Sequence, residues 1–273
     1  MKKVLVVSDL QTGSKYSNWP TELPIKDGGH WRLNPKQRIV KAAWDSFVRL
    51  ANEKIRPDVI VLNGDMIEGC QYKSQAAPVV TPEASEQCEA AKILLGPLLD
   101  SCKEAYLVRG TEYHDGLNGQ DIERLGKDLD CIPYRKNQYS DWVLNLDIEG
   151  VVINFAHHIS VSTGIYRATA PDREGIWGAL SGKAKTPDAD CIVRSHVHTF
   201  VHVEHSKKHI IITPGWQLQT EYQIKKSYYR MFPEIGSVLL HLYPELKEKG
   251  EDPIEVKKII CKIPREACVI SNV

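Results

Sequence analysis

Short apolar runs that end in polar side chains recur along most of the chain. The first is KVLVVSD at 3–9, and comparable runs lie at 58–65, 105–115, 151–158 and 190–198. Each is rich in Val and Ile and is continuous rather than alternating, which is typical of strands covered on both faces. Farther on, the segment FVHVEHSKKHIIITPG predicts two strands around a turn at 206–208. GSVLLHLY and IEVKKIICKI alternate more, as antiparallel strands do.

Apolar residues at helical spacing lie between the first runs. Asn34 followed by Pro35 is typical of an N-cap and first turn, and the spacing after it predicts a helix to about Lys54. Further helices are predicted from Thr81 to a break at Gly96-Pro97, over 121–129, and over 173–180. Strands that alternate with helices, followed by C-terminal strands over 236–273, predict a layered α/β sandwich in a single domain of residues 1–273.

The longest segment without a regular pattern runs from about residue 11 to residue 34. A loop of this length within a compact domain is usually functional or disordered. It carries Tyr16, Trp19, His30 and Trp31 and follows directly after the polar end of the first strand. We therefore expect residues 12–34 to form a lid or a substrate wall, and the alternative is an arm that packs on a neighbouring subunit.

Charge and cysteine content narrow the classes of partner and compartment. Lys and Arg together number 35 and Asp and Glu together number 35, and this balance does not favour a protein that grips extended nucleic acid. The seven cysteines are scattered without a CxxC pair, which favours reduced thiols and a cytoplasmic location. No apolar run approaches the ~20 residues of a membrane span, so a membrane partner is not expected.

The polar residues at the strand ends form an ordered set. They are Asp9 and Gln11, Asn63 and Asp65, Glu112 and His114, His157 and His158, and His196 and His198. The carboxyl ends of strands in an α/β sheet are the usual place for a site. Five strands that deliver carboxylates and imidazoles to one edge would make a metal-binding pocket, and this ligand mixture suits Mn, Fe or Zn.

This ordered set resembles the calcineurin-like metallophosphoesterases, whose pattern is D-x-H, GD-x-x-x, GNH(D/E), H and GH-x-H. The corresponding pieces here are DLQ at 9–11, GDMIEG at 64–69, GTEYHD at 110–115, AHH at 156–158 and SHVH at 195–198. The resemblance covers about residues 4–215. It implies a four-layer αββα sandwich and two divalent metal ions, with Mn²⁺ favoured and Fe, Zn or Mg as alternatives.

The resemblance also implies roles for individual residues. Asp65 would be the carboxylate that bridges the two metals. The other ligands of one metal would be Asp9, Gln11 and His198. The other ligands of the second metal would be His157, His196 and the residue in the Asn slot of GNH. His114 would be the catalytic histidine, which donates a hydrogen bond or a proton to the phosphate or the leaving group.

Three departures from the family pattern affect these expectations. Gln11 replaces a histidine ligand, and because an amide oxygen is a harder and weaker ligand, we expect a weakened metal on that side. Thr111 or Glu112 could fill the Asn slot, and Glu112 is favoured because a carboxylate binds divalent cations well. Ser195 replaces a glycine, which is a mild change if the backbone there does not need a positive φ.

Several residues remain open between a functional and a structural role. His157 is favoured over His158 as the ligand by the strand register. Arg109 could reach a phosphate oxygen or form a structural ion pair. The histidines 202, 205 and 209 favour a solvated hairpin face over a second metal site.

The function predicted from these residues is that of a metal-dependent phosphoesterase with a dinuclear centre. Phosphodiesters or nucleotides are the favoured substrates, including short nucleic acid, because aromatic residues near the site could stack on bases. The alternative is a catalytically weak or inactive relative that acts as a binding or scaffold module. The sequence predicts neither the oligomeric state nor the pathway.

Overall fold

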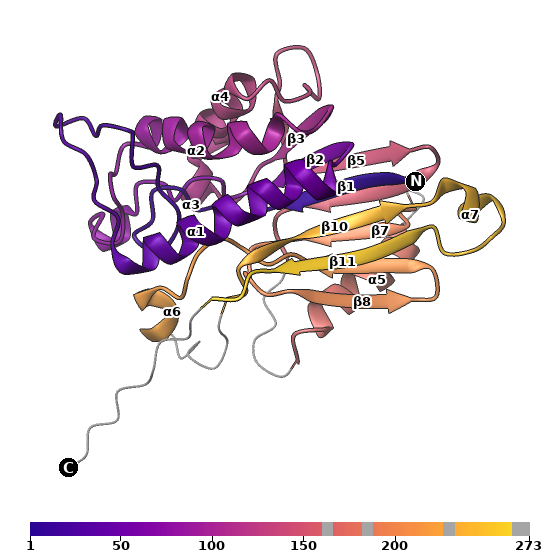
Figure 1. The fold of residues 1–273 in the computed structure, drawn as a ribbon. Coiled ribbons are helices and arrows are strands. Elements are labelled where there is room, and N and C mark those ends of the chain that lie inside the picture. Colours follow the sequence, from indigo (N-terminus) through magenta and orange to yellow (C-terminus); the bar gives the residue numbers. More distant parts are fainter. Residues whose placement is uncertain (160–165, 182–187, 226–232, 264–273) are drawn as a thin grey trace.

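A computed structural model describes residues 1–159, 166–181, 188–225 and 233–263 (Figure 1). Its strands form two mixed sheets. The first sheet has the order β11-β10-β1-β2-β3-β4, with bounds Ile254–Ile260, Gly236–Leu242, Lys2–Val7, Val59–Asn63, Glu104–Val108 and Ser140–Asp141. The second has the order β5-β6-β7-β9-β8, with bounds Val143–Ile148, Val151–Ala156, Cys191–Arg194, Lys208–Ile212 and Val201–His205.

The helices lie mostly between these strands in the chain. They are α1 (Pro35–Leu50), α2 (Ala84–Leu99), α3 (Glu112–Asp115), α4 (Gln120–Asp128), α5 (Thr169–Ser181), α6 (Glu221–Lys225) and α7 (Pro244–Glu248). A π-helical turn (Ala51–Ile55) extends α1, and two short 3₁₀ turns occupy Tyr72–Ser74 and Leu117–Gly119. None of the helices in the described ranges is long and apolar enough to cross a membrane.

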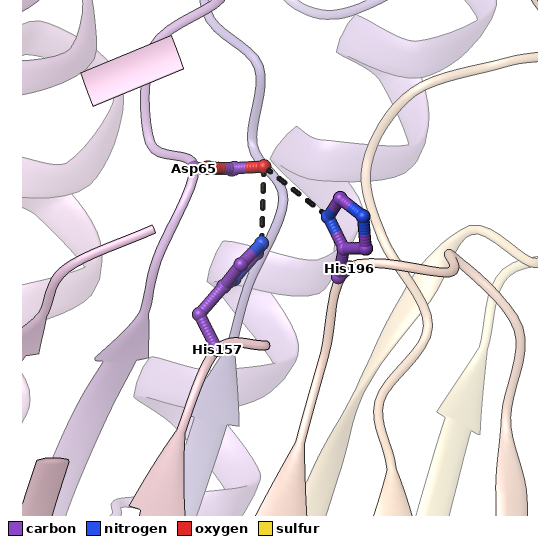
Figure 2. A group of neighbouring side chains, drawn as sticks. All are labelled: Asp65, His157 and His196. Carbon is purple, nitrogen blue, oxygen red and sulfur yellow. Dashed lines mark ion pairs between the residues drawn. The ribbon is translucent and has the colours of Figure 1, made fainter. Parts of the chain in front are cut away.

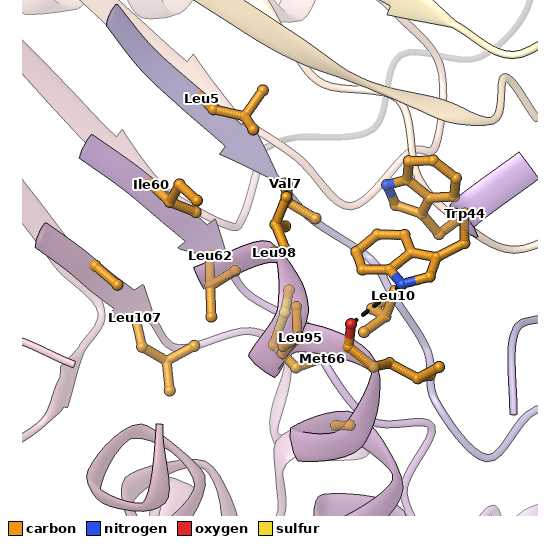
Figure 3. Close-up of a cluster of buried hydrophobic side chains, with 14 of the residues drawn as sticks. Leu5, Val7, Leu10, Trp44, Ile60, Leu62, Met66, Leu95, Leu98 and Leu107 are labelled. Atoms are coloured by element: carbon orange, nitrogen blue, oxygen red, sulfur yellow. Dashed lines mark hydrogen bonds between the residues drawn. The ribbon is translucent and has the colours of Figure 1, made fainter. Parts of the chain in front are cut away.

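The strand β1 shows why its apolar run is continuous. Val4 and Val6 point into the space between the two sheets, where they join a buried cluster with residues such as Phe155 of the second sheet. Leu5 and Val7 point the other way, into the cluster beneath the helices that Figure 3 shows. Because both faces of the strand are covered, alternating polarity would leave polar groups buried.

Helices cover the outer face of each sheet. Trp44 of α1 donates from its indole nitrogen to the Leu94 carbonyl of α2 over 3.2 Å, and both helices pack on the first sheet (Figure 3). On the second sheet, α5 packs against β8 and β9, with Gly175 close to the side chain of Ile210. The layers are therefore helix, sheet, sheet and helix, and the predicted four-layer αββα sandwich is confirmed.

The predicted start of α1 is confirmed, whereas the predicted end of α2 is wrong. Asn34 accepts from the Gln37 amide over 2.9 Å, and the Gln37 side chain accepts from the Asn34 amide over 3.2 Å, which is a full capping box. The helix α2 continues through Gly96-Pro97 to Leu99. Pro97 lies in the last turn, and the carbonyl that its missing N–H would have bonded belongs to the exposed Ile93, where water can satisfy it.

The segment 12–34 forms isolated bridges and no helix or strand. Its first half is not a surface loop, since Trp19 is fully buried and packs with Leu33 and Ala90. Trp19 is therefore not available to stack on a base, and the role of residues 12–34 as a lid or arm stays a prediction. The C-terminal strands predicted over 236–273 are β10 and β11, and 264–273 lie outside the described residues.

Candidate metal centre

The parallel strands of both sheets direct their carboxyl ends to one place. Asp9 follows β1 and Asp65 follows β2 in the first sheet, while His157 follows β6 and both His196 and His198 follow β7 in the second. The Nδ1 atom of His157 lies 2.8 Å from the carbonyl oxygen of Asn63 at the end of β2, so the two sheets meet directly at this point. The edge that the sequence predicted is thus shared by both layers.

Asp65 lies at the centre of this group (Figure 2). Its Oδ2 atom is 3.0 Å from His157 Nε2 and 4.0 Å from His196 Nδ1. Asp65 and His157 are buried, while the His196 side chain is 33% exposed and is the part of the cluster that solvent reaches. One carboxylate and two imidazole nitrogens, all within 4.8 Å of one another, form a suitable cradle for a divalent cation.

The backbone at these positions is unusual. Asp9, Gln11, Asp65, His196 and His198 all have φ between 50° and 78°, a region that non-glycine residues rarely adopt. Such strain persists only where the surrounding structure enforces it, and it concentrates at functional sites. Neighbouring glycines permit the close approach of the chains, because a Cβ at residue 64 would meet the His157 ring and a Cβ at residue 110 would meet the Asp65 carboxylate.

The hydrogen bond of His157 fixes the proton on its ring. A carbonyl oxygen can only accept, so Nδ1 donates to Asn63, and the neutral ring presents a bare lone pair at Nε2. That lone pair faces Asp65 Oδ2 at 3.0 Å and Asp9 Oδ1 at 3.7 Å. Burial lowers the pKa of His157, but the two carboxylates outweigh it and raise the pKa to about 10. The two carboxylates therefore favour a positive charge at this position, from a proton or from a metal ion.

Asp9 supports the same conclusion. Its Oδ1 atom lies 3.2 Å from His198 Nε2, and its Oδ2 accepts from the His196 amide over 3.3 Å. Within the described part of the chain, Asp9 Oδ1 and His157 Nε2 are completely buried and have no well-aligned hydrogen-bond partner. Buried polar atoms without partners are costly, and divalent cations bound beside them would satisfy both atoms. The donor set thus fits the divalent metals that the family resemblance implies.

His114 also faces the cluster. Its Nδ1 lies 2.7 Å from the Glu68 carbonyl, which makes Nδ1 the donor and directs Nε2 to within 3.9 Å of Asp65 Oδ2. Burial lowers the pKa of His114 despite the nearby Asp65 carboxylate. Its position at the margin of the cluster is compatible with the predicted contact to substrate.

Gln11 is oriented by a hydrogen bond that the sequence did not predict. The Gln217 amide nitrogen donates to Gln11 Oε1 over 3.3 Å, and Gln11 Nε2 approaches Asp65 Oδ2 at 3.5 Å. The same Gln217 nitrogen is 2.9 Å from Ser14 Oγ and 2.8 Å from Glu68 Oε2. The amide nitrogen of Gln11, and not the oxygen that could bind a metal, therefore faces Asp65.

Glu68 and Gln217 are the residues that sequence reasoning missed. Both are buried, and burial together with the Asp65 charge raises the pKa of the Glu68 carboxyl well above its usual range. Gln217 comes shortly after the carboxyl end of β9, so the strand-end argument applied to that strand would have found it. Glu68 lies within the quoted GDMIEG motif, but only its burial distinguishes it from a surface carboxylate.

The structure places Thr111, rather than Glu112, next to Asp65. The Thr111 amide donates to Asp65 Oδ1 over 2.6 Å and its hydroxyl lies 3.1 Å from the same atom. Glu112 is the first residue of the short helix α3 and is exposed. Its role as a metal ligand stays a prediction, and it would require the side chain to turn inward.

Arg109 and His158 are the two remaining residues whose roles the sequence left open. Arg109 donates to Ser140 Oγ over 2.9 Å and pairs with Glu123 at 3.4 Å, which matches the structural alternative, so contact with a phosphate would require it to leave Glu123. The exposed His158 ring lies 5.4 Å from the ring of His196. Burial and the two neighbouring imidazoles lower its pKa, so it presents a neutral ring beside His196.

Ser195 occupies the glycine position of the last motif without strain. It is not among the described residues with positive φ. Its hydroxyl lies 2.6 Å from Asn63 Nδ2 and 2.7 Å from Thr213 Oγ1, so the serine joins a buried network beneath the cluster. Asn63 therefore has a structural hydrogen-bonding role.

Comparison with known proteins gives distant structural similarity. No protein-family model matches the chain, and no curated protein sequence matches it. The crystal structure of Vps29 with one substitution, from Entamoeba histolytica, is similar at a TM-score of 0.45 and 12% identity, and the match covers 95% of this chain and 99% of that chain. An archaeal phosphodiesterase is similar at 0.42 and 12%, covering 95% and 99%. A predicted phosphoesterase from Streptococcus pneumoniae is similar at 0.37 and 10%, covering 95% and 98%.

The layers and the strand ends carry the fold assignment. Helices cover both outer faces of two packed sheets, and the five motif segments follow the carboxyl ends of β1, β2, β3, β6 and β7. This four-layer sandwich, with its motifs in that order, is the arrangement that the sequence resemblance to the calcineurin-like metallophosphoesterases implies.

Proposed function

We propose that this protein is a metal-dependent phosphoesterase that hydrolyses phosphodiesters or nucleotides. The observation that carries the proposal is the pair of buried atoms Asp9 Oδ1 and His157 Nε2, which face each other at 3.7 Å without aligned hydrogen bonds. Beside them lie the Asp65 carboxylate and the partly exposed His196 side chain, which is where a phosphate ester would approach the cluster.

Two cation positions are proposed, and Asp65 would be common to both. His157 and His196 would complete one position, and Asp9, His198 and Gln11 would complete the other. The second is the weaker, because Gln11 must release Gln217 before its oxygen can bind a cation. Mn²⁺ is the favoured ion, since it accepts both imidazole and amide oxygen.

The chemistry asks mainly for charge and positioning. Divalent cations bound there would supply the positive charge that stabilises a phosphoryl group under attack. Thr111 fixes the Asp65 carboxylate through its amide and hydroxyl. His114, held through Nδ1 by the Glu68 carbonyl, would direct Nε2 at a substrate or leaving-group oxygen.

The test is Mn²⁺-dependent hydrolysis of an aryl phosphodiester and of the matching monoester. The wild type should turn over the diester, and His114→Ala should lower the rate by about 100-fold or more, the range for loss of a general acid or base. His205→Ala is a matched control, because His205 is an exposed histidine paired with Asp172. Absence of turnover with Mn²⁺, Mg²⁺, Zn²⁺ and Fe²⁺ would contradict the proposal.

The second candidate function is a binding or scaffold module with weak or no catalysis. The orientation of Gln11 favours it, because a neutral amide donor faces Asp65 where a second cation would need a ligand oxygen. This candidate predicts that one Mn²⁺ binds with no turnover of either ester. Calorimetric titration of the same preparation separates the two functions.

The favoured compartment is the cytoplasm. The cysteines of the described residues are free thiols, among them the buried Cys88, Cys131 and Cys191. Burial raises the pKa of Cys88 and Cys131 to about 12, so these thiols are small apolar core groups rather than nucleophiles.

A further inference from the structure

A second group of potential metal ligands lies on the β8–β9 hairpin. His202 and Glu204 belong to β8, and His209 belongs to β9. Glu204 pairs directly with His209, and His202 pairs with Ile211, so the three ligand side chains share one face of the hairpin. One ligand atom from each of the three lies within 4.8 Å of the others.

The hairpin group is separate from the candidate metal centre. His209 pairs with Cys191 at the start of β7, whereas His196 and His198 follow the end of that strand. The hairpin turn is joined to the segment after α7, because Lys207 Nζ donates to the Gly250 carbonyl. Figure 1 shows α7 at the end of the sheets where the N-terminus lies, away from the carboxyl end of β1.

The hydrogen bonds of His209 prepare it as a ligand. Its Nε2 lies 2.9 and 3.0 Å from the two carboxylate oxygens of Asp252, which places the proton on Nε2. The buried ring therefore presents a bare lone pair at Nδ1, and this atom is 2.9 Å from His202 Nε2. A carboxylate that holds the far nitrogen of an imidazole is the usual outer-shell partner of a metal-binding histidine.

We propose that His202, Glu204 and His209 form a zinc-binding site, with Asp252 orienting His209. Two imidazoles and one carboxylate, with a solvent molecule in the fourth position, are the ligand set of tetrahedral Zn²⁺ sites that keep one coordination position open. Ligands 2.0–2.1 Å from a tetrahedral ion lie about 3.3 Å apart, so the two histidine nitrogens would separate by a few tenths of an ångström.

The position of the group indicates what the ion would do. β8 is the edge strand of the second sheet, whereas Asp252 lies just before β11, the edge strand of the first sheet. The Asp252 carboxylate also accepts from the Ile254 amide over 2.9 Å, which fixes it to the start of β11. An ion on the hairpin would strengthen the link between the two sheet edges, and Glu204, which is exposed, leaves a path for the ion to enter.

The alternative is a chain of hydrogen bonds without metal, in which His202 donates to His209 and His209 donates to Asp252. Zinc content after equilibration with Zn²⁺ and desalting separates the two. His202→Ala should hold one Zn²⁺ fewer per chain than the wild type, and Glu204→Gln should bind that ion at least tenfold more weakly. His205→Ala, which changes the next histidine of the same strand, should retain the wild-type content. Equal zinc content in the wild type and His202→Ala would overturn the proposal.

A second measurement, thermal unfolding, needs no count of the ions bound at the candidate metal centre. In an Asp65→Asn background, Zn²⁺ should raise the temperature of thermal unfolding, and adding His202→Ala should abolish that rise. An equal rise in both proteins would overturn the proposal. Hydrolysis of phosphodiesters should be unchanged by His202→Ala, so failure of the phosphoesterase proposal and failure of the zinc proposal are distinguishable.

Discussion

On one side of Asp65 the neighbouring side chains are imidazoles, and on the other side they are amides and a buried carboxyl. The imidazole side consists of His157 and His196, and the amide side consists of Gln11, Gln217 and Glu68. Both sides are formed at strand ends, and both surround the same carboxylate. They differ in whether the native hydrogen bonds leave a lone pair for a cation.

On the imidazole side the hydrogen bonds leave a ligand atom free. His157 Nδ1 donates to the Asn63 carbonyl, which leaves Nε2 directed at Asp65. On the amide side Gln217 donates a hydrogen bond to the side-chain oxygen of Gln11. The side-chain nitrogen of Gln11 therefore points toward Asp65. A residue type that can bind a metal therefore does so only if its own partners leave the right atom exposed.

The largest effect is expected from Asp65→Asn, because Asp65 is common to both sides. Replacing the carboxylate by an amide removes a charged ligand from each cation position. Mn²⁺ affinity and diester turnover should fall by more than the roughly 100-fold that loss of an outer-shell partner causes. Asp188→Asn is the control, since the Asp188 side chain is 79% exposed, and equal affinities in the two variants would contradict the shared role.

Gln11→His should reduce the difference between the two sides. An imidazole in place of the amide supplies a stronger ligand for the position near Asp9 and His198. We expect the weaker Mn²⁺ to bind at least about tenfold more tightly, which corresponds to about 1.4 kcal/mol. Calorimetric titration measures both affinities, and Gln11→Leu is the control of similar size without a ligand atom. If Gln11→His and Gln11→Leu bound the more weakly held Mn²⁺ with equal affinity, residue 11 would not contact that cation position.

The last comparison concerns stability at the Asn slot, where Thr111→Val and Glu112→Ala are compared. Loss of the Thr111 hydroxyl removes a hydrogen bond to a buried carboxylate and should lower the free energy of unfolding by about 1.5 kcal/mol. Glu112 is exposed, so its truncation should change that free energy by less than about 0.5 kcal/mol. Chemical denaturation measures both, and Mn²⁺ titration of Glu112→Ala tests the predicted ligand role. A loss of Mn²⁺ affinity in Glu112→Ala would show that Glu112 is the metal ligand that corresponds to the Asn of GNH.

Local patterns were sufficient for the sandwich and for most of the cluster. Val4 to Val7 form a continuous apolar run because both faces of β1 are covered, and a residue that ends such a run lies at the sheet edge wherever the strand pairs. Asp9, Asp65, His157 and His196 could be placed in this way. The prediction of a helix break at Gly96-Pro97 was wrong, because a proline in the last turn of α2 removes only one hydrogen bond.

The amino-acid sequence by itself determined which strand ends carry carboxylates and imidazoles, because periodicity and motif order are local properties of the chain. The tertiary structure alone decided which atoms face Asp65. Gln217, whose amide donates to Gln11, lies 206 residues from it along the chain. Likewise, the carboxylate that orients His209 is Asp252, which is 43 residues away. Hydrogen bonds between distant segments leave no periodic signal, so the direction of a side chain is known only when its partners are in place.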